Sequence, residues 1–246
     1  MSELAGKVAL VTGGSRGIGA AITKRLARDG ADVALTYHSA ADRARGIVTE
    51  LERTGRRGLA IAADSADPEA VTRAVERAAT ELGRLDILVN SAGVFPYGQV
   101  EDVTPEEYEN TMAVHVRAVF VAVQAASRHL GSGGRIISIG SSLAEQTPFP
   151  GISLYALSKS ALVGLTKGLA RDFGERGITA NVVHPGATDT DMNPADGAGS
   201  DAQRQFIALG HYGNTEDVAA TVAHLAGEGG RYITGQAITV DGGWTA

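Results

Sequence analysis

The residues of this sequence that could do chemistry begin with a tyrosine and a lysine four positions apart. Tyr155 and Lys159 fall near the start of a strongly helical pattern, so they share one helix face. A tyrosine hydroxyl has a pKa of about 10 and is a poor acid or base at neutral pH. A neighbouring ammonium stabilises the phenolate and lowers that pKa toward the range where proton transfer works best. The spacing therefore predicts a general acid–base pair.

A serine strengthens this interpretation. Ser142 ends a predicted strand thirteen residues before Tyr155. Ligands of open parallel sheets bind at the carboxyl ends of the strands, so the serine and the helical pair converge on one edge. The three residues together are more specific than a tyrosine and a lysine at helical spacing.

A glycine-rich turn near the N-terminus predicts a phosphate-binding site. The stretch "LVTGGSRGIGAAITKRLARDG" is a strand, a turn with glycines at 13, 17 and 19, and a helix. Glycines let the backbone approach a pyrophosphate, which is stabilised by the positive end of the helix dipole. The residues expected to hold a dinucleotide here are Gly13, Ser15, Arg16, Gly17, Ile18 and Gly19.

The second strand indicates which dinucleotide binds. NAD sites carry an acidic residue at the end of this strand, where it accepts from the ribose 2′-hydroxyl. Thr36 stands there instead, and Arg16 can reach a 2′-phosphate with Arg43 nearby. The residues expected to line this part of the site are Tyr37, His38 and Ser39. The sequence predicts NADPH/NADP+ as cofactor.

The elements that must position these residues alternate along the chain. Short apolar runs at 7–13, 31–37, 58–64, 85–90, 134–141 and 178–186 read as buried parallel strands with amphipathic helices between them. We therefore expect an α/β fold: a single Rossmann-like domain over residues 1–246, with a doubly wound parallel sheet and helices on both faces. The polar stretch 189–212 is either a disordered insertion or a substrate lid.

Composition limits the remaining function classes. The 246 residues include no cysteine and carry a net charge of −6, which excludes disulfides and thiolate metal ligands. Charges of both signs are interspersed, so we expect no nucleic-acid partner. The N-terminus shows neither a signal peptide nor a membrane span. We expect a cytoplasmic protein with no membrane partner and no metal site.

The motifs together resemble the short-chain dehydrogenase/reductase family, and closely its 3-oxoacyl-[acyl-carrier-protein] reductase branch. The matching stretches are "TGGSRGIG", "AADSAD", "NSAG", "YALSK", "HPGATDTDM" and "ITGQAITVDGG", together with Ser142. By this resemblance Tyr155 is the general acid in ketone reduction, Lys159 lowers its pKa and holds the nicotinamide ribose, and Ser142 orients the substrate carbonyl. The resemblance also implies a homotetramer.

Further cofactor contacts follow from the same resemblance. Asp64 and Ser65 would contact adenine. The residues expected to line the cofactor cleft are Asn90, Ala92 and Gly93, and those expected around the nicotinamide are Pro185, Gly186, Thr188 and Thr190.

Two positions depart from the family pattern: Ser91, small and polar, replaces an asparagine with little consequence, whereas His115 concerns catalysis. His115 occupies the place of an asparagine that acts as a fourth catalytic residue, holding a water that relays protons through the lysine. It falls on a helical stripe with Tyr108, Met112, Val119 and Val123, so it is either a buried core histidine or a replacement for the relay residue. If a neutral imidazole sustains the relay, activity should fall as the pH drops through the histidine titration.

The sequence thus predicts an NADPH-dependent reductase of a small ketone, free or thioester-linked, such as a 3-oxoacyl or polyketide-like compound. An NAD(H)-dependent alcohol dehydrogenase is the first alternative, which Thr36 and Arg16 disfavour. The second alternative is an NADP-binding regulatory protein with weakened catalysis, for which His115 is the support.

Overall fold

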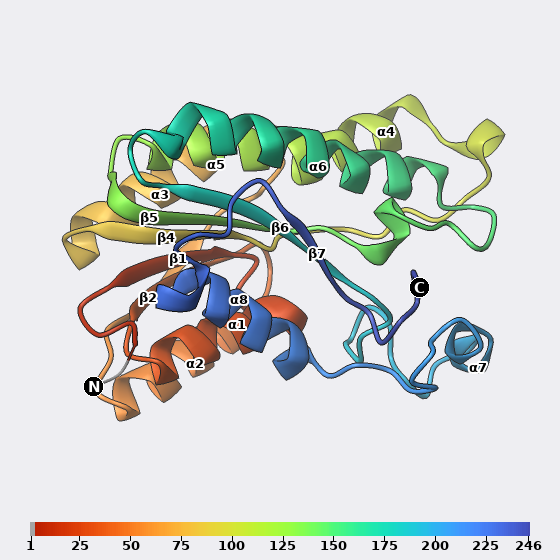
Figure 1. The fold of residues 1–246 in the computed structure, drawn as a ribbon, viewed down its shortest axis with the longest axis horizontal. Coiled ribbons are helices and arrows are strands. Elements are labelled where there is room, and N and C mark those ends of the chain that lie inside the picture. Colours follow the sequence, from red (N-terminus) through yellow and green to blue (C-terminus); the bar gives the residue numbers. More distant parts are fainter. Residues whose placement is uncertain (1–2) are drawn as a thin grey trace.

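One parallel sheet organises the computed structural model, which describes residues 3–246. Within these residues seven strands lie in the order β3-β2-β1-β4-β5-β6-β7 (Figure 1). They are β1 (Val8–Thr12), β2 (Asp32–Tyr37), β3 (Gly58–Ala62), β4 (Leu85–Asn90), β5 (Leu130–Ile139), β6 (Thr179–Pro185) and β7 (Ala237–Val240). The strand order changes direction between β1 and β4, which creates the switch point where ligands of such sheets bind.

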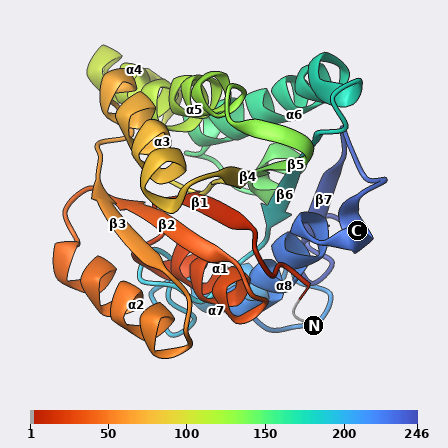
Figure 2. The ribbon, with the colours of Figure 1, turned by 90° about the vertical axis from the view of Figure 1, so that its left-hand side faces the viewer.

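Helices cover both faces of this sheet. One face carries α1 (Gly17–Arg28), α2 (Ala41–Arg53) and α8 (Thr215–Ala226); the other carries α3 (Pro68–Leu82), α4 (Pro105–Met112), α5 (Ala118–Ala126) and α6 (Ser153–Gly174), as Figure 2 shows. The predicted fold class is confirmed.

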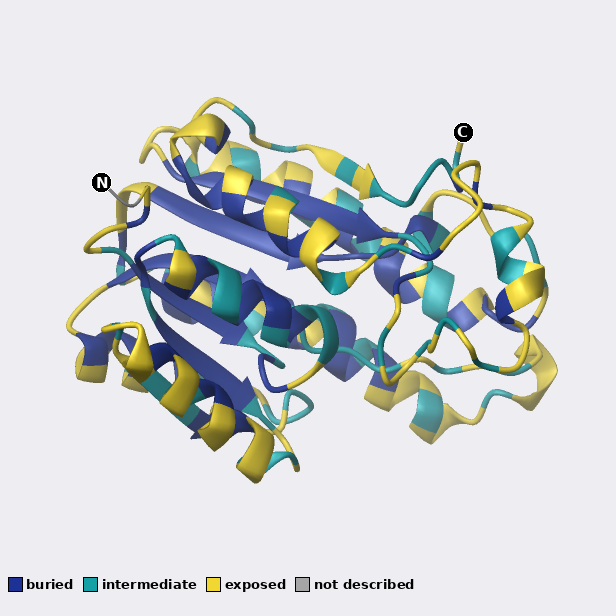
Figure 3. Ribbon diagram, turned by 90° about the horizontal axis from the view of Figure 1, so that it is seen from below, coloured by how far each residue is buried: buried dark blue, intermediate teal, exposed yellow. Residues whose placement is uncertain are grey.

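The core explains why the strands read as continuous apolar runs. Successive side chains of β1 point to opposite faces: Val11 joins the cluster of Leu26 on α1, whereas Leu10 joins that of Val75 on α3. Both clusters are shielded from solvent, so the central strands are buried while the outer helix faces are exposed (Figure 3).

Local capping sets several helix boundaries. The Asp67 carboxylate accepts from the Glu69 N–H at 2.8 Å, and Gly83, with φ of 87°, follows the last residue of α3. The Thr104 hydroxyl accepts from the backbone N–H of Glu107 at 3.1 Å before α4. These contacts satisfy backbone donors that a helix start leaves unpaired.

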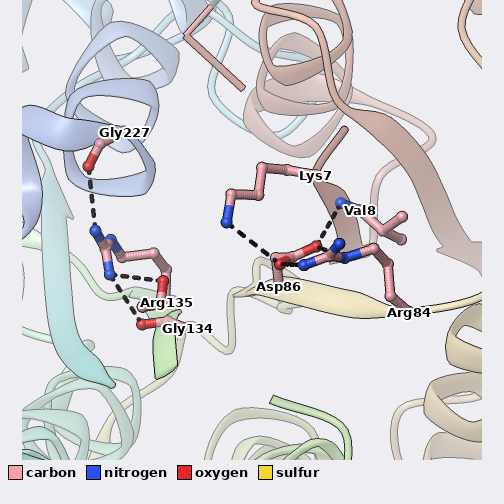
Figure 4. Close-up of polar contacts among 8 residues, drawn as sticks. Lys7, Val8, Arg84, Asp86, Gly134, Arg135 and Gly227 are labelled. Carbon is pink, nitrogen blue, oxygen red and sulfur yellow. Dashed lines mark hydrogen bonds and ion pairs between the residues drawn. The ribbon is translucent and has the colours of Figure 1, made fainter. Parts of the chain in front are cut away.

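The amino ends of the central strands are joined by charged groups (Figure 4). Asp86 at the start of β4 accepts from the Val8 N–H of β1 at 2.9 Å. The guanidinium of Arg84 donates to both oxygens of the same carboxylate, at 2.7 and 2.8 Å. This network fixes the ends of β1 and β4 opposite the switch point.

Two local features were not predicted. Strand β7 is a short edge strand with alternating exposure, so it lacks the apolar run that marks the other strands. Ala113–Arg117 forms a π-helical turn between α4 and α5. The turn inserts a residue into the helical period, so the expected stripe is wrong at Tyr108, which is 41% exposed, whereas Val119 and Val123 are buried.

The stretch 189–212 is folded. It contains α7 (Ser200–Arg204), and the side chains of Asn193 and Gln203 form two hydrogen bonds of 3.1 Å. Ile207 and Tyr212 pack on Trp244 in a small separate core. The stretch is therefore not a disordered insertion, and its role as a lid stays a prediction. None of the helices in residues 3–246 has the length and apolar character needed to cross a bilayer.

Candidate functional site

A cavity of about 400 Å³ opens at the carboxyl ends of the strands, beside the switch point. The lid and the C-terminal segment complete its wall. The predicted cofactor residues that line it are Gly13, Ser15, Arg16, Gly17, Ile18, Gly19, Tyr37, His38, Ser39, Asp64, Ser65, Ala92, Gly93, Tyr155, Lys159, Pro185, Gly186, Thr188 and Thr190. Residues far apart in sequence are therefore brought to one site.

The glycine turn is shaped for close backbone approach. Gly13 has φ of 65°, and a Cβ atom there would lie 2.8 Å from the Cα of Ala92. A Cβ at Gly19 would lie 2.4 Å from the Gly13 carbonyl oxygen. The exposed Arg16 side chain lines the cavity at the start of α1. The turn thus offers a helix N-terminus and a cation to a phosphate, which fits a dinucleotide.

The end of β2 shapes the part of the cavity next to this turn. The Thr36 hydroxyl accepts from the Gly13 N–H at 3.0 Å, so it braces the glycine turn. Arg43, expected near a 2′-phosphate, instead forms an ion pair with Asp191 of the lid. Arg16 is therefore the guanidinium left to meet a phosphate here.

Asn90 departs from its expected place in the cofactor cleft. It is the last residue of β4, and its side-chain amide donates to the Ser138 hydroxyl on β5 at 3.4 Å. Asn90 and Ser138 are register partners, so their side chains point to the same side of the sheet. Asn90 is 4% exposed and supports the cleft from beneath, while Ser91, Ala92 and Gly93 line it.

The serine that contacts Tyr155 is Ser141. Its side chain hydrogen-bonds the Tyr155 hydroxyl. Ser142 also lines the cavity, but only 2% of its surface is exposed. It begins a 3₁₀ turn, and its backbone carbonyl accepts from the N–H groups of Glu145 and Gln146. The geometry thus favours Ser141 for the position that the thirteen-residue spacing gave to Ser142.

Burial raises the pKa of Tyr155, and the Ser141 hydrogen bond only opposes this shift. The expectation that Lys159 lowers this pKa is not met. The lysine ammonium donates to the Ile139 carbonyl at 3.0 Å and lies 5.7 Å from the centre of the tyrosine ring. The tyrosine therefore keeps its proton at neutral pH, as a general acid must.

Lys159 itself is shifted by the same surroundings. The residue is 5% exposed, and burial lowers the pKa of its ammonium from 10.5 to about 8. The ammonium is thus present at neutral pH and is lost as the pH rises past about 8. It faces the cavity beside Tyr155, where it can donate to a ribose hydroxyl.

His115 lies outside the cavity lining, 1% exposed, in the π-helical turn. Its Nε2 accepts from the Val94 N–H at 3.0 Å, so its proton is on Nδ1. That Nδ1 donates to the Ser158 hydroxyl at 2.8 Å, and Ser158 donates to the Tyr155 carbonyl at 2.7 Å. The imidazole connects the loop after β4 to the helix that carries the tyrosine.

The electrostatics of His115 overturn the expected pH effect. Burial and the charge of Lys159 lower its pKa from 6.5 to about 2. The ring is therefore neutral throughout the physiological range, and no acidic limb of activity arises from its titration. The interpretation of His115 as a buried, hydrogen-bonded histidine is the one the structure supports.

A second buried histidine was missed by the sequence reasoning. His184 in β6 is fully buried, and its Nδ1 accepts from the Ser141 N–H at 2.9 Å. Its Nε2 lies 3.7 Å from the Glu145 carboxylate. The ring packs against Gly140, where a Cβ atom would lie 2.2 Å from Nδ1. A single sequence gives no indication that the histidine before "PG" contacts the glycine before "SS".

Comparisons with known proteins identify the family of the chain. A family model described as Enoyl-(Acyl carrier protein) reductase matches residues 13–245. The chain belongs to the short-chain dehydrogenase/reductase family. This confirms the resemblance drawn from the motifs.

Solved structures and relatives of the short-chain dehydrogenase/reductase family match over the full chain. A short-chain dehydrogenase from Burkholderia cenocepacia, crystallised with NADP, is 61% identical with a TM-score of 0.98, covering 99% of this chain and 100% of that one. The cyclic-di-GMP-binding biofilm dispersal mediator protein of Escherichia coli is 42% identical over 100% of both chains. The versicolorin reductase of Emericella nidulans is 39% identical over 98% of this chain and 96% of the relative.

Proposed function

We propose that this protein is an NADPH-dependent reductase that converts a ketone to a secondary alcohol, with Tyr155 as general acid. The observation that carries the proposal is the meeting of the Tyr155 hydroxyl, the Ser141 hydroxyl and the Lys159 ammonium in the cavity that also holds the glycine turn. The NADP in the Burkholderia relative and the reductase name of the Emericella relative support it.

NADPH would supply the hydride that the carbonyl carbon receives. Ser141 would donate a hydrogen bond to the carbonyl oxygen, so the bond polarises where negative charge develops. Tyr155 would give its proton to that oxygen, because burial keeps the phenol protonated at neutral pH. Lys159 would hold the nicotinamide ribose beside Tyr155. The products are the alcohol and NADP+.

The preference for NADPH over NADH rests on charge. Thr36, Tyr37, His38 and Ser39 line the end of β2 without a carboxylate that would repel a 2′-phosphate, and Arg16 supplies a cation. This arrangement argues against the NAD(H)-dependent alcohol dehydrogenase.

The regulatory alternative has one relative in its favour, the E. coli protein with cyclic-di-GMP in its name. The deciding experiment measures NADPH oxidation by absorbance with a panel of ketones, for the natural sequence and for Tyr155→Phe. We expect turnover that the phenylalanine variant nearly abolishes while NADPH still binds. Equal turnover by both proteins would refute Tyr155 as the acid, and no turnover with any ketone would favour the regulatory function.

A further inference from the structure

Aromatic side chains gather at the end of the cavity that lies beyond Tyr155. The chain has only five phenylalanines and one tryptophan. Phe95 comes from the loop after β4, Phe149 from the loop before α6, and Trp244 from the C-terminal segment, and all three line the cavity. These segments meet at the end of the molecule where α7 lies (Figure 1).

The rings form two walls. Phe95 meets Tyr155 edge to face, with ring centres 4.8 Å apart and an angle of 67°, and it is 41% exposed. Phe95 is therefore the aromatic side chain of the cavity wall that contacts the ring of Tyr155. The second pair is Phe149 and Trp244, whose ring centres lie 6.5 Å apart at an angle of 85°.

The charge around this end disfavours an anionic substrate carrier, although Arg43 neutralises Asp191 there. The lid stretch 189–212 contains four aspartates and one arginine. That arginine, Arg204, is paired with Asp201. Near the reacting atoms Lys159 is the charged group of the lining, and its ammonium is held by the Ile139 carbonyl. Phosphate-bearing thioesters and acidic carrier proteins would meet repulsion at this lid.

We propose that the cavity takes an uncharged aromatic ketone, whose flat ring lies between Phe95 and the Phe149–Trp244 wall while its carbonyl oxygen faces Tyr155. Two aromatic rings in edge-to-face or offset contact gain stabilisation beyond the area they bury, which a saturated group of the same size lacks. The proposal rests on the reductase function proposed above and narrows its substrate class to free aryl ketones.

The test compares acetophenone with cyclohexyl methyl ketone, which has the same carbon count but no flat ring. The ratio of kcat/KM for the two ketones is measured for the natural sequence, Phe95→Leu and Phe149→Leu. Intrinsic reactivity cancels when ratios are compared between proteins. Losing one ring contact should lower the ratio about two- to tenfold in each variant. Phe120→Leu, at an exposed phenylalanine on α5, is the matched control and should keep the ratio.

An unchanged ratio in both cavity variants would overturn the proposal. Faster turnover of acetoacetyl-coenzyme A than of acetophenone would also overturn it. Binding gives a separate readout, because Trp244 is the only tryptophan and its fluorescence should be quenched at lower concentrations by acetophenone than by the cyclohexyl ketone. Such quenching without NADPH oxidation would refute the reductase function and leave the ring preference standing.

Discussion

Replacing His115 by asparagine should flatten the pH dependence of folding stability. The buried ring resists protonation in the folded protein, where its pKa is lowered to about 2, whereas an unfolded chain binds a proton at the ordinary value of 6.5. Stability from this group is therefore complete above pH 6.5 and is lost as the pH falls below it, because the unfolded state alone gains the proton.

The size of the effect follows from the two pKa values. Below pH 6.5 each pH unit costs about 1.4 kcal/mol, so lowering the pH from 8 to 5 should remove about 2 kcal/mol of stability through this one residue. For a chain of this length that loss corresponds to roughly 4–8 °C in Tm. His115→Asn removes the titrating group, so the acid-induced fall in Tm should be smaller by that amount.

The assay is thermal unfolding without cofactor at several pH values between 5 and 8, for the natural sequence, His115→Asn and His211→Asn. His211 is exposed in the lid, so its variant should follow the natural curve. Asparagine can satisfy only one of the two histidine contacts, and we expect a modest loss of stability at pH 8 as well. If the natural sequence and His115→Asn lose the same Tm on acidification, the ring is already protonated or solvated and the reasoning fails.

Arg16→Ala should weaken NADPH binding by about ten- to a hundredfold and leave NADH binding nearly unchanged in fluorescence titrations; equal losses would give Arg16 a structural role. Ser141→Ala should lower kcat by roughly 10²–10³, while Ser142→Ala stays within a few-fold, and the reverse order would return the role to Ser142. kcat/KM should fall above about pH 8 as Lys159 loses its charge, and Lys159→Arg should move that alkaline limb upward. His184→Ala should lower kcat about five- to a hundredfold, because it leaves the Ser141 N–H without its acceptor, and His184→Gln should recover part of the lost kcat. An unchanged kcat in the alanine variant would contradict this positioning role.

Much of this architecture could be read from local patterns. Strands buried on both faces leave continuous apolar runs, and a glycine turn between strand and helix fixes where the switch point lies. The predicted cofactor residues therefore line one cavity, except for Asn90. Its misplacement has a simple cause, because the side a strand residue faces depends on its register with neighbours, here with Ser138.

Predictions made from residue spacing were wrong where the backbone is irregular. The turn after β5 decides whether Ser141 or Ser142 reaches Tyr155, and no regular period applies to a 3₁₀ turn followed by a loop. The π-helical turn has the same consequence for the helix before it, since one inserted residue rotates Tyr108 away from the stripe that Val119 and Val123 share.

The two buried histidines show what a sequence cannot express about a site of this kind. A backbone N–H donates to Nε2 of His115 and to Nδ1 of His184, so the two rings hold opposite tautomers. Burial lowers the pKa of both, so each acts as a fixed neutral acceptor. One ring positions the helix of Tyr155 and the other positions the backbone of Ser141. The same residue type at two positions thus holds the proton donor and its hydrogen-bonding partner in place without exchanging protons with either.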